Sequence, residues 1–415
     1  MRRLLEGFGL LLVLVTLTTK LAAAAPLPPE NSWWRLSALP ESGQGAVVAL
    51  AEDPQNANHL LVGSGSGHIY SSTDAGSSWH QVAAGLGKGV LTIDFLSDRS
   101  GVVLAGARQG GIWRSQNQGE SWSRLSAFSS ASVRAFGGSL PWLVAASDHG
   151  LLQSSEGTQW RSLSLGESNL SAVAVSGAGK TAALLAGSDL PQSGTGTPLF
   201  LSSDGGQSWN RQSGSAVGSS MVETMLAWPS DGPSQVVMGT NAGAFISDNG
   251  GAQWNPLSGG GTLPVTDITT VGARPDQPQD FYLGSDGGGS SSGGLWVTRD
   301  GGAHFSALNP PFSSVTALTV GGGDIPPLYA ATFNPQGQSG ELWGYRDGGG
   351  PPTTPSSMLA PMAPSSTRSG GVAGSGGWLA TLPRAPETPF LLVGLLALIT
   401  LLLAWGKPSR RRINR

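Results

Sequence analysis

Short apolar runs alternate with polar, glycine-rich segments along most of the chain. The first three runs span 47–50, 59–63 and 68–71, and a fourth follows Trp79. Apolar runs this short, bounded by Gly, Ser, Asn and Asp, are typical of β-strands. The pattern therefore predicts an all-β fold in which a unit of four strands recurs.

One eight-residue segment, which reads Ser-Thr-Asp-Ala-Gly-Ser-Ser-Trp at 72–79, marks these units. Four further copies keep the acid or amide, the glycine and the closing aromatic residue. They lie at 115–122, 202–209, 247–254 and, with Phe in place of Trp, 298–305. A weaker copy at 153–160 keeps Gly157 and Trp160. The aromatic residues lie roughly 40 to 50 residues apart, a period that indicates propeller blades. We call these segments the box turns.

Three residues of each box turn have separate expected roles. Asp or Asn accepts hydrogen bonds from backbone N–H groups two residues onward, glycine takes a positive φ, and the aromatic side chain is buried between adjacent sheets. The residues assigned to these roles are Asp74, Gly76, Trp79, Asn117, Gly119, Trp122, Asp204, Gly206, Trp209, Asn249, Gly251, Trp254, Asp300, Gly302 and Phe305. Because each carboxylate stands alone in its own unit, we predict that it caps a turn and binds no metal.

In these segments the chain resembles the Asp-box (BNR-type) β-propellers, a superfamily that includes sialidases, xyloglucanases, sortilin-type receptors and photosystem II stability/assembly factors. The resemblance covers 32–349. Asp53-Pro54 before the second strand, with Gly63 and Gly67 before the third, makes the pattern most similar to the assembly-factor and sortilin/xyloglucanase branches. The resemblance implies a propeller and leaves the function open.

The two ends of the repeat region determine the expected number of blades. Residues 345–349 look like a seventh box turn that stops before its aromatic residue, and 32–36 resembles the strand that follows a box turn. We therefore expect residues 31–37 to supply the outer strand of the last blade and to close the ring. The prediction is a seven-bladed propeller, with six blades as the alternative.

Composition narrows the possible chemistry. Of 415 residues, 63 are Gly and 28 are Pro, charged residues make up 12%, and the formal net charge is −3. This balance offers no basic surface for nucleic acid. The chain has no cysteine, which excludes disulfides, thiolate metal sites and cysteine nucleophiles. Since the five histidines show no zinc spacing, we predict no metal and no cofactor, and we expect a monomer.

The two termini predict a membrane location. Residues 1–24 have the basic, apolar and small-residue regions of a signal peptide, with an uncleaved anchor as the alternative. A Gly/Pro/Ser/Thr-rich stalk at 350–388 leads to an apolar segment at 389–406 that is predicted to span the membrane, and a basic tail follows at 407–415. The positive-inside bias places this tail in the cytoplasm. We therefore expect a single-pass protein of the cell membrane with an extracytoplasmic propeller at 31–349.

A first candidate site is the central channel of the propeller. Aligning the innermost strands places one residue of each at a position that faces the channel. This set is Thr92, Arg134, Ala172, Glu223, Asp267 and Ala317, with Asp94 two residues beyond Thr92. Arg134, Glu223 and Asp267 are candidates for a ligand or ion site at the channel mouth. The alternative is that these polar side chains are solvated structural groups.

A second candidate is the set of loops on the face opposite the box turns. These loops vary in length whereas the box turns do not, as expected when loops on a rigid scaffold carry recognition. Arg108, Asp148 and Asp189 lie in them and are predicted to contact a ligand. Solvated connectors are the alternative interpretation.

The sequence shows no assembled catalytic set. The resemblance to sialidases would require a Tyr/Glu pair and three convergent arginines, and xyloglucanase-type hydrolysis would require paired carboxylates between two propellers. Segment 176–181 imitates a phosphate-binding loop, but a strand follows it, so we interpret it as a hairpin turn. We predict a membrane-anchored, non-enzymatic propeller that binds a protein or glycan partner in the manner of an assembly factor. The alternative is an extracytoplasmic glycoside hydrolase of the sialidase or xyloglucanase type.

Overall fold

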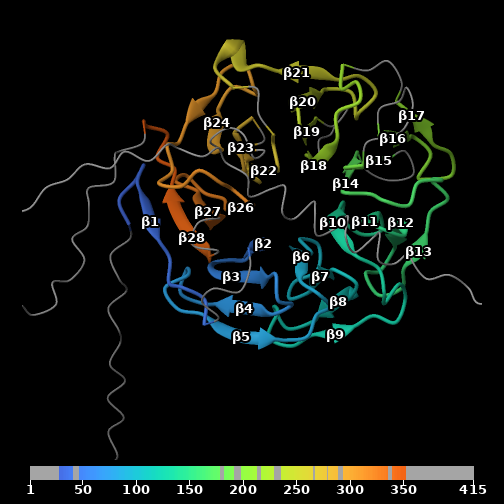
Figure 1. The fold of residues 1–415 in the computed structure, drawn as a ribbon, viewed down its shortest axis with the longest axis horizontal. Coiled ribbons are helices and arrows are strands. Elements are labelled where there is room, and N and C mark those ends of the chain that lie inside the picture. Colours follow the sequence, from blue (N-terminus) through green and yellow to red (C-terminus); the bar gives the residue numbers. More distant parts are fainter. Residues whose placement is uncertain are drawn as a thin grey trace, which may run out of the picture.

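The computed structural model describes residues 28–40, 46–177, 182–190, 198–212, 216–228, 235–264, 267–277, 279–287, 293–334 and 339–351. These residues form seven antiparallel sheets of four strands each. The sheets stand around a central axis as the blades of a propeller (Figure 1). The predicted all-β propeller is confirmed, and the number of blades is seven.

The first four blades follow one another in chain order, and the first strand of each is innermost (Figure 1). Blade 1 contains β2 (Val47–Asp53), β3 (Asn56–Ser64), β4 (Ile69–Ser72) and β5 (His80–Ala83). Blade 2 contains β6 (Val90–Phe95), β7 (Val103–Ala107), β8 (Gly111–Ser115) and β9 (Ser123–Arg124). Blade 3 contains β10 (Val133–Gly137), β11 (Leu143–Ser147), β12 (Gly150–Ser154) and β13 (Arg161–Ser162). Blade 4 contains β14 (Ala172–Ser176), β15 (Ala183–Gly187), β16 (Leu199–Ser202) and β17 (Asn210–Arg211).

The remaining three blades complete the ring. Blade 5 contains β18 (Val222–Ala227), β19 (Val236–Thr240), β20 (Gly243–Ser247) and β21 (Asn255–Leu257), and a short 3-10 turn, η2 (Gly259–Gly261), follows it. Blade 6 contains β22 (Thr270–Ala273), β23 (Phe281–Ser285), β24 (Gly294–Thr298) and β25 (Ser306–Ala307). Blade 7 combines β26 (Ala317–Val320), β27 (Pro327–Asn334) and β28 (Ser339–Arg346) with β1 (Trp33–Arg35) from the other end of the sequence.

The N-terminal strand closes the ring, as predicted. β1 pairs antiparallel with β28, so Trp33 lies opposite Tyr345 and Trp34 opposite Gly344 (blue beside orange in Figure 1). Trp33 is 6% exposed, packs against Tyr345 and donates from Nε1 to the carbonyl of Leu308 at 2.9 Å. Glycine is needed opposite Trp34, because a Cβ at Gly344 would lie 2.3 Å from the indole ring.

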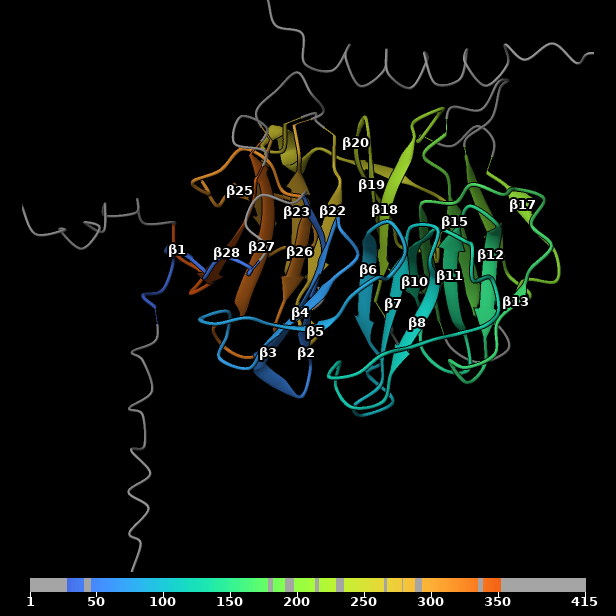
Figure 2. The same cartoon turned by 60° about the horizontal axis from the view of Figure 1, so that its bottom comes forward.

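The hydrophobic core is divided into layers between neighbouring blades. Between blades 1 and 2, for example, Ala49 and Leu61 pack against Val90. Glycine in the second strand lets the next inner strand approach, since a Cβ at Gly63 would lie 2.5 Å from Cγ1 of Val90. Figure 2 shows the inner strands standing side by side around the channel. This close packing leaves little freedom in the angle between blades.

Each box turn is stabilised by side-chain hydrogen bonds to the backbone. The Ser72 hydroxyl donates to Asp74 at 2.8 Å and accepts from the N–H of Gly76 at 2.8 Å, where φ is 83°. Asp74 accepts from the N–H of Ser78 at 2.8 Å. The predicted acceptor pattern is therefore wrong, because the N–H that the acid binds lies four residues onward. The same bond recurs at Asn117, Asp204, Asn249 and Asp300.

The closing aromatic residues differ in burial. Trp160, Trp254 and Phe305 are buried, as predicted. Trp79, Trp122 and Trp209 are only half-buried. The prediction of burial is wrong for these three, so the same position of the box turn is buried to different degrees in different blades.

Residues 345–349 do not repeat the box-turn bonding. Tyr345 stands where the other copies have Ser or Thr, so the hydroxyl that organises the turn is missing. Asp347 is instead buried, accepts from the phenol of Tyr282 at 2.6 Å and pairs with Arg299 at 2.5 Å. Its similarity to a seventh box turn is confined to the sequence.

Among the described residues, no helix is long and apolar enough to cross a membrane. The predicted signal peptide at 1–24, the span at 389–406 and the tail at 407–415 lie outside the described residues. So does the predicted stalk after Pro351.

Replacing Trp33 by Ala is expected to lower the free energy of unfolding by about 3–5 kcal/mol, the usual loss for a truncated buried aromatic side chain. Urea denaturation followed by circular dichroism measures this change. Trp209→Ala, which truncates a half-buried indole of a box turn, is the matched control and should lose less. Equal losses would contradict the importance of ring closure.

Candidate functional site

The inner strands that line the channel carry an irregularity near their start. β2, β6, β10 and β18 each show a register shift there. The residues inserted in β10 and β18 are Arg134 and Glu223. A β-bulge redirects a side chain and is frequent beside functional sites. Arg134 and Glu223 therefore occupy equivalent positions in blades 3 and 5.

The sequence alignment predicts that one residue of each inner strand occupies the same channel-facing position. This prediction is wrong, because the aligned residues stand at three different positions relative to the second strands of their blades. Thr92, Ala172 and Ala317 lie one residue beyond the position that Arg134 and Glu223 occupy in their blades. Their partners in the second strand are Gly106, Gly187 and Ala331. Asp267 lies before β22 begins. Spacing along the sequence does not reveal a bulge, which explains the error.

Most of this set nevertheless faces the channel. A cavity of about 310 Å³ in the channel is lined by Thr92, Arg134, Ala172, Glu223 and Ala317, among others. Asp94 lies farther along β6 and lines a second cavity toward the other mouth.

Arg134 and Asp189 form an ion pair at the channel mouth. Nη1 of Arg134 donates to both carboxylate oxygens of Asp189, at 2.9 and 2.8 Å. Both side chains are about one-third exposed. Asp189 belongs to the loop after β15, so this pair joins the channel of blade 3 to a rim loop of blade 4. The structure thus brings together residues that the sequence placed in two separate candidate sites.

Glu223 lies in the same acidic environment. Burial raises the pKa of Glu223 to about 7. The neighbouring carboxylates Asp267, Asp189 and Asp286 act in the same direction, and Arg134 opposes them. Glu223 is therefore close to half protonated at neutral pH, and its carboxyl can either donate a hydrogen bond or carry a negative charge.

Asp267 has an incompletely satisfied carboxylate. Burial, with a further contribution from Asp286, raises its pKa to about 6. Within the described part of the chain, its buried Oδ1 has no hydrogen-bond partner. Asp286 itself was missed by the sequence analysis, although it lies in the rim loop after β23, where variable length had already suggested recognition.

The other two predicted rim residues have different surroundings. Arg108 is exposed between β7 and β8. Asp148 accepts from the N–H of Ser132 at 2.8 Å and contacts Nδ1 of His149 at 2.7 Å. Burial opposes ionisation of Asp148, but these hydrogen bonds outweigh it and lower the pKa. Asp148 therefore orders the rim, and among the described contacts neither it nor Arg108 touches Arg134.

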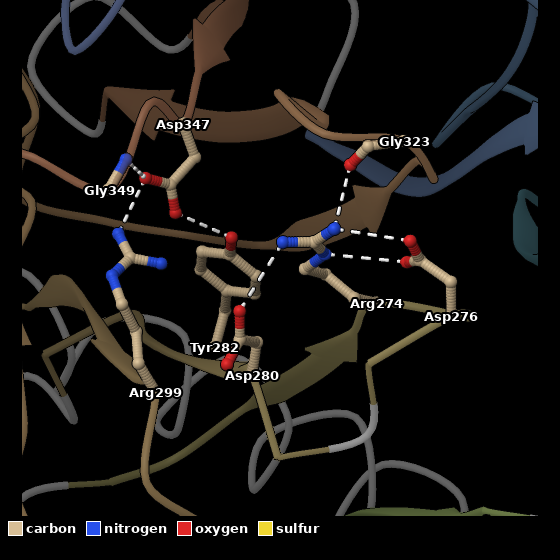
Figure 3. A network of polar contacts seen from close by, with 8 residues as sticks. All are labelled: Arg274, Asp276, Asp280, Tyr282, Arg299, Gly323, Asp347 and Gly349. Atoms are coloured by element: carbon tan, nitrogen blue, oxygen red, sulfur yellow. Dashed lines mark hydrogen bonds and ion pairs between the residues drawn. The ribbon is translucent and has the colours of Figure 1, made fainter.

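A second polar network lies between blades 6 and 7 (Figure 3). The fully buried Asp347 binds Arg299 and the phenol of Tyr282. Burial and the adjacent carboxylate raise the pKa of Tyr282 far above its usual range, which makes the phenol a poor nucleophile. Arg299 is thus engaged with a buried partner and is no ordinary surface charge.

The other half of this network is centred on Arg274. Its guanidinium pairs with Asp276 at 3.1 Å and Asp280 at 3.4 Å, and it donates to the carbonyl of Gly323 at 2.7 Å (Figure 3). The charge of Arg274 is already compensated by these carboxylates. We therefore interpret the network as a structural connection between blades 6 and 7. Of segment 176–181, Ser176 ends β14 and Gly177 follows it, and residues 178–181 lie outside the described residues. β14 pairs antiparallel with β15.

Comparisons with known proteins support the fold. No protein-family model and no curated protein matches this sequence. The GH74 xyloglucanase from Xanthomonas campestris has a TM-score of 0.54 at 17% identity, over 76% of this chain and 56% of the enzyme. The extracellular domain of a hybrid two-component system from B. thetaiotaomicron has a TM-score of 0.55 at 15% identity, over 77% of this chain and 41% of that one. YCF48 bound to a D1 peptide has a TM-score of 0.50 at 15% identity, over 75% of this chain and 94% of YCF48.

At these identities the likeness concerns the fold alone. The chain spans little more than half of the xyloglucanase's length, so the rest of that enzyme has no counterpart in this alignment. The neighbours include a xyloglucanase, a protein bound to a D1 peptide and an extracellular domain of a two-component system, as expected of a fold that hosts unrelated functions.

Replacing Glu223 by Gln tests the acidic site through its pH dependence. Because the folded-state pKa is raised from 4.5 to about 7, the folded wild type holds the extra proton between these values and loses stability as the pH rises through them. The variant cannot ionise, so its melting temperature should exceed that of the wild type at pH 8 and approach it at pH 4.5. Differential scanning calorimetry measures both. Glu156→Gln, at an exposed position, is the control and should show no such pH-dependent difference.

Proposed function

We propose that this chain is a non-catalytic, ligand-binding propeller that recognises a protein or glycan with the loops around one channel mouth, opposite the box turns. The observation that carries this proposal is the convergence of Arg134, Asp189, Glu223 and Asp267 at that mouth. These residues come from four consecutive blades, and their charges interact. Polar groups that gather from separate elements in a concave place are typical of binding sites.

The backbone contacts distinguish the two faces of the ring. On one face the box turns lie beside the turns between first and second strands, as in the bond from Ala75 N–H to the carbonyl of Asn58 at 2.9 Å. On the other face the second-to-third loops lie beside the segments between blades, as in the bond from Leu86 N–H to the carbonyl of Gly67 at 2.9 Å. The Arg134–Asp189 pair belongs to the second face.

Two comparisons are consistent with a binding role. The YCF48 structure, which this chain matches over nearly all of YCF48, holds a D1 peptide. The two-component system neighbour is an extracellular domain. An Asp-box propeller of the assembly-factor type, held outside the cell membrane by the predicted span at 389–406, is the interpretation that agrees with both. The support for the membrane anchor is the apolar segment at 389–406 of the amino-acid sequence.

A glycoside hydrolase is the second candidate, favoured by one observation. Glu223 and Asp267 are neighbouring acids with raised pKa values of about 7 and about 6, as a general acid requires. Against it, Arg134 is already paired with Asp189, and the buried Tyr282 is unsuited to sialidase chemistry.

Assay of the full chain on chromogenic β-glucosides, xyloglucan oligosaccharides and sialosides separates the two candidates. We expect no turnover above the buffer rate. Turnover that Glu223→Gln or Asp267→Asn abolishes, with folding retained by circular dichroism, would establish the hydrolase instead.

The binding face is tested by charge reversal. Combining Arg108→Glu, Asp148→Lys and Asp189→Lys should reduce capture of a partner from membrane extracts about tenfold or more, since charges that complement a partner at this face would then repel it. Quantitative pull-down with the tagged full chain measures the capture. The control combines Glu120→Lys and Glu156→Lys, two exposed positions in box turns, and should keep wild-type capture. Arg299 is unsuitable as a control because of its pairing with Asp347. Equal loss from both sets would refute the face assignment.

A further inference from the structure

Residues 188–190, in the loop after β15, connect three blades at the channel mouth. Ser188 is fully buried, and its carbonyl accepts from the N–H of Val222 in β18 at 3.0 Å. Asp189 comes next and accepts from Nη1 of Arg134 in β10 at 2.8 and 2.9 Å. Segment 188–190 of blade 4 is therefore attached to blade 5 by a backbone hydrogen bond and to blade 3 by an ion pair.

These two attachments respond differently to charge. The bond between Ser188 and Val222 joins two buried backbone groups, whereas both members of the Arg134–Asp189 pair are about one-third exposed. Beyond the pair, the N–H of Leu190 donates to the Ser188 hydroxyl at 3.2 Å. The side chain of Leu190 is 42% exposed, and among the described residues it is the one exposed large apolar side chain. The ion pair thus controls the outer end of the segment, where Leu190 lies.

Arg134 has unused hydrogen-bond donors. A guanidinium carries five N–H groups in a fixed fork. To the residues that the structure describes, only Nη1 of Arg134 donates, and both of its bonds go to Asp189. Nε and Nη2 are therefore available for a second acceptor. Arg134 also lines the channel cavity, so such an acceptor can approach from the channel.

Glu223 supplies that acceptor. It lines the same cavity and directly follows Val222, whose bond to Ser188 brings Glu223 beside the segment that carries Asp189. Within the described part of the chain, the carboxyl of Glu223 makes no hydrogen bond. Arg134 and Glu223 occupy equivalent bulge positions in blades 3 and 5, on either side of blade 4. The carboxyl of Glu223 and the carboxylate of Asp189 therefore compete for one guanidinium.

The charge of Glu223 changes near neutral pH. The charged groups that face it are Arg134 of β10, Asp189 after β15, Asp267 before β22 and Asp286 after β23. Burial and the three acids raise the pKa of Glu223 to about 7, and Arg134 opposes them. Asp267, with a pKa of about 6, already carries its charge when Glu223 ionises. The ionised Glu223 attracts Arg134 and repels Asp189, and both effects weaken the Arg134–Asp189 pair.

We propose that the Arg134–Asp189 pair is a latch on the proposed binding face and that Glu223 opens it. With a proton on Glu223, Arg134 stays with Asp189, and Leu190 is held at the channel mouth. When that proton passes to the solvent, the carboxylate accepts from Nε and Nη2 of Arg134, and Asp189 and Leu190 leave the mouth. The latch is therefore closed at about pH 5.5 and open at about pH 8.5. As a regulator of partner binding it rests on the proposed function, but its movement is a property of the chain alone.

A single spin label at position 190 tests this movement. Because the chain has no cysteine, Leu190→Cys in the full chain accepts one nitroxide label. Electron paramagnetic resonance then measures the mobility of the label as the pH rises from about 5.5 to about 8.5. We expect the mobile fraction to increase about fivefold or more, with a midpoint near the pKa of Glu223, about 7. The same label at Glu156→Cys, an exposed position in a box turn, should keep its mobility.

Variants in the Leu190→Cys background assign the transition to its residues. Glu223→Gln cannot ionise and should keep the label immobile throughout. Arg134→Gln removes the latch and should leave the label mobile throughout, and Glu156→Gln should change nothing. If Glu223→Gln does not fold, the titration of the unmodified site and Arg134→Gln still decide the matter. Mobility that is constant with pH, that falls as the pH rises, or that still changes in Glu223→Gln would overturn the proposal.

Pull-down of a partner by the unlabelled full chain separates this proposal from the proposed function. We expect capture to be about fivefold stronger at about pH 6 than at about pH 8.5, and equal at both in Glu223→Gln. An intact label transition without capture at either pH would refute the binding function and leave the latch standing. Capture that is independent of pH, with a label whose mobility does not change, would refute the latch alone.

Discussion

The pairing of β1 with β28 is the contact on which the rest of the propeller depends. Without it, blade 7 would end in an unpaired edge strand, and the sequence-distant ends of the ring would meet only through side chains. Trp33 adds a buried ring and a hydrogen bond to Leu308, and Gly344 leaves room for the indole of Trp34. This one pairing joins residues near the two ends of the described chain. The conformational entropy of closing the ring is therefore lost only once, while the closed ring stabilises the packing between all the blades.

Within the closed ring, the residue at the start of the inner strand has one of two roles in blades 3 to 7. In blades 4, 6 and 7 a hydroxyl at this position joins the blade to the next one. Ser171 donates to the carbonyl of Val222 at 2.5 Å, and Thr316 donates to that of Val47 at 2.6 Å. In blades 3 and 5 the equivalent residues are Arg134 and Glu223, which face the channel cavity. The site at the channel mouth therefore arises where charged residues replace the hydroxyls that connect blades.

The two mouths of the channel are lined by different residues, because different loops and turns surround them. At the rim opposite the box turns, loops reach inward, and Asp189 compensates Arg134. At the box-turn mouth, burial raises the pKa values of Glu52 and Asp94, as it raises those of Glu223 and Asp267 at the other mouth. One ring of strands thus holds partly buried acids at both ends of its channel.

The repeat, the strand pattern and the closure by residues 31–37 can be predicted from the amino-acid sequence, because each depends on local turn chemistry and on a period that the chain displays directly. The same reasoning identifies Arg134, Glu223 and Asp267 as candidates. The pairing of Asp189 with Arg134 is visible only in the folded molecule, because the bulge in β10 moves the Arg134 side chain by one position relative to the alignment. The same holds for Glu52, whose carboxylate lies against Gly321 of the last blade. Contacts between blades join residues far apart in sequence, and no local pattern records them.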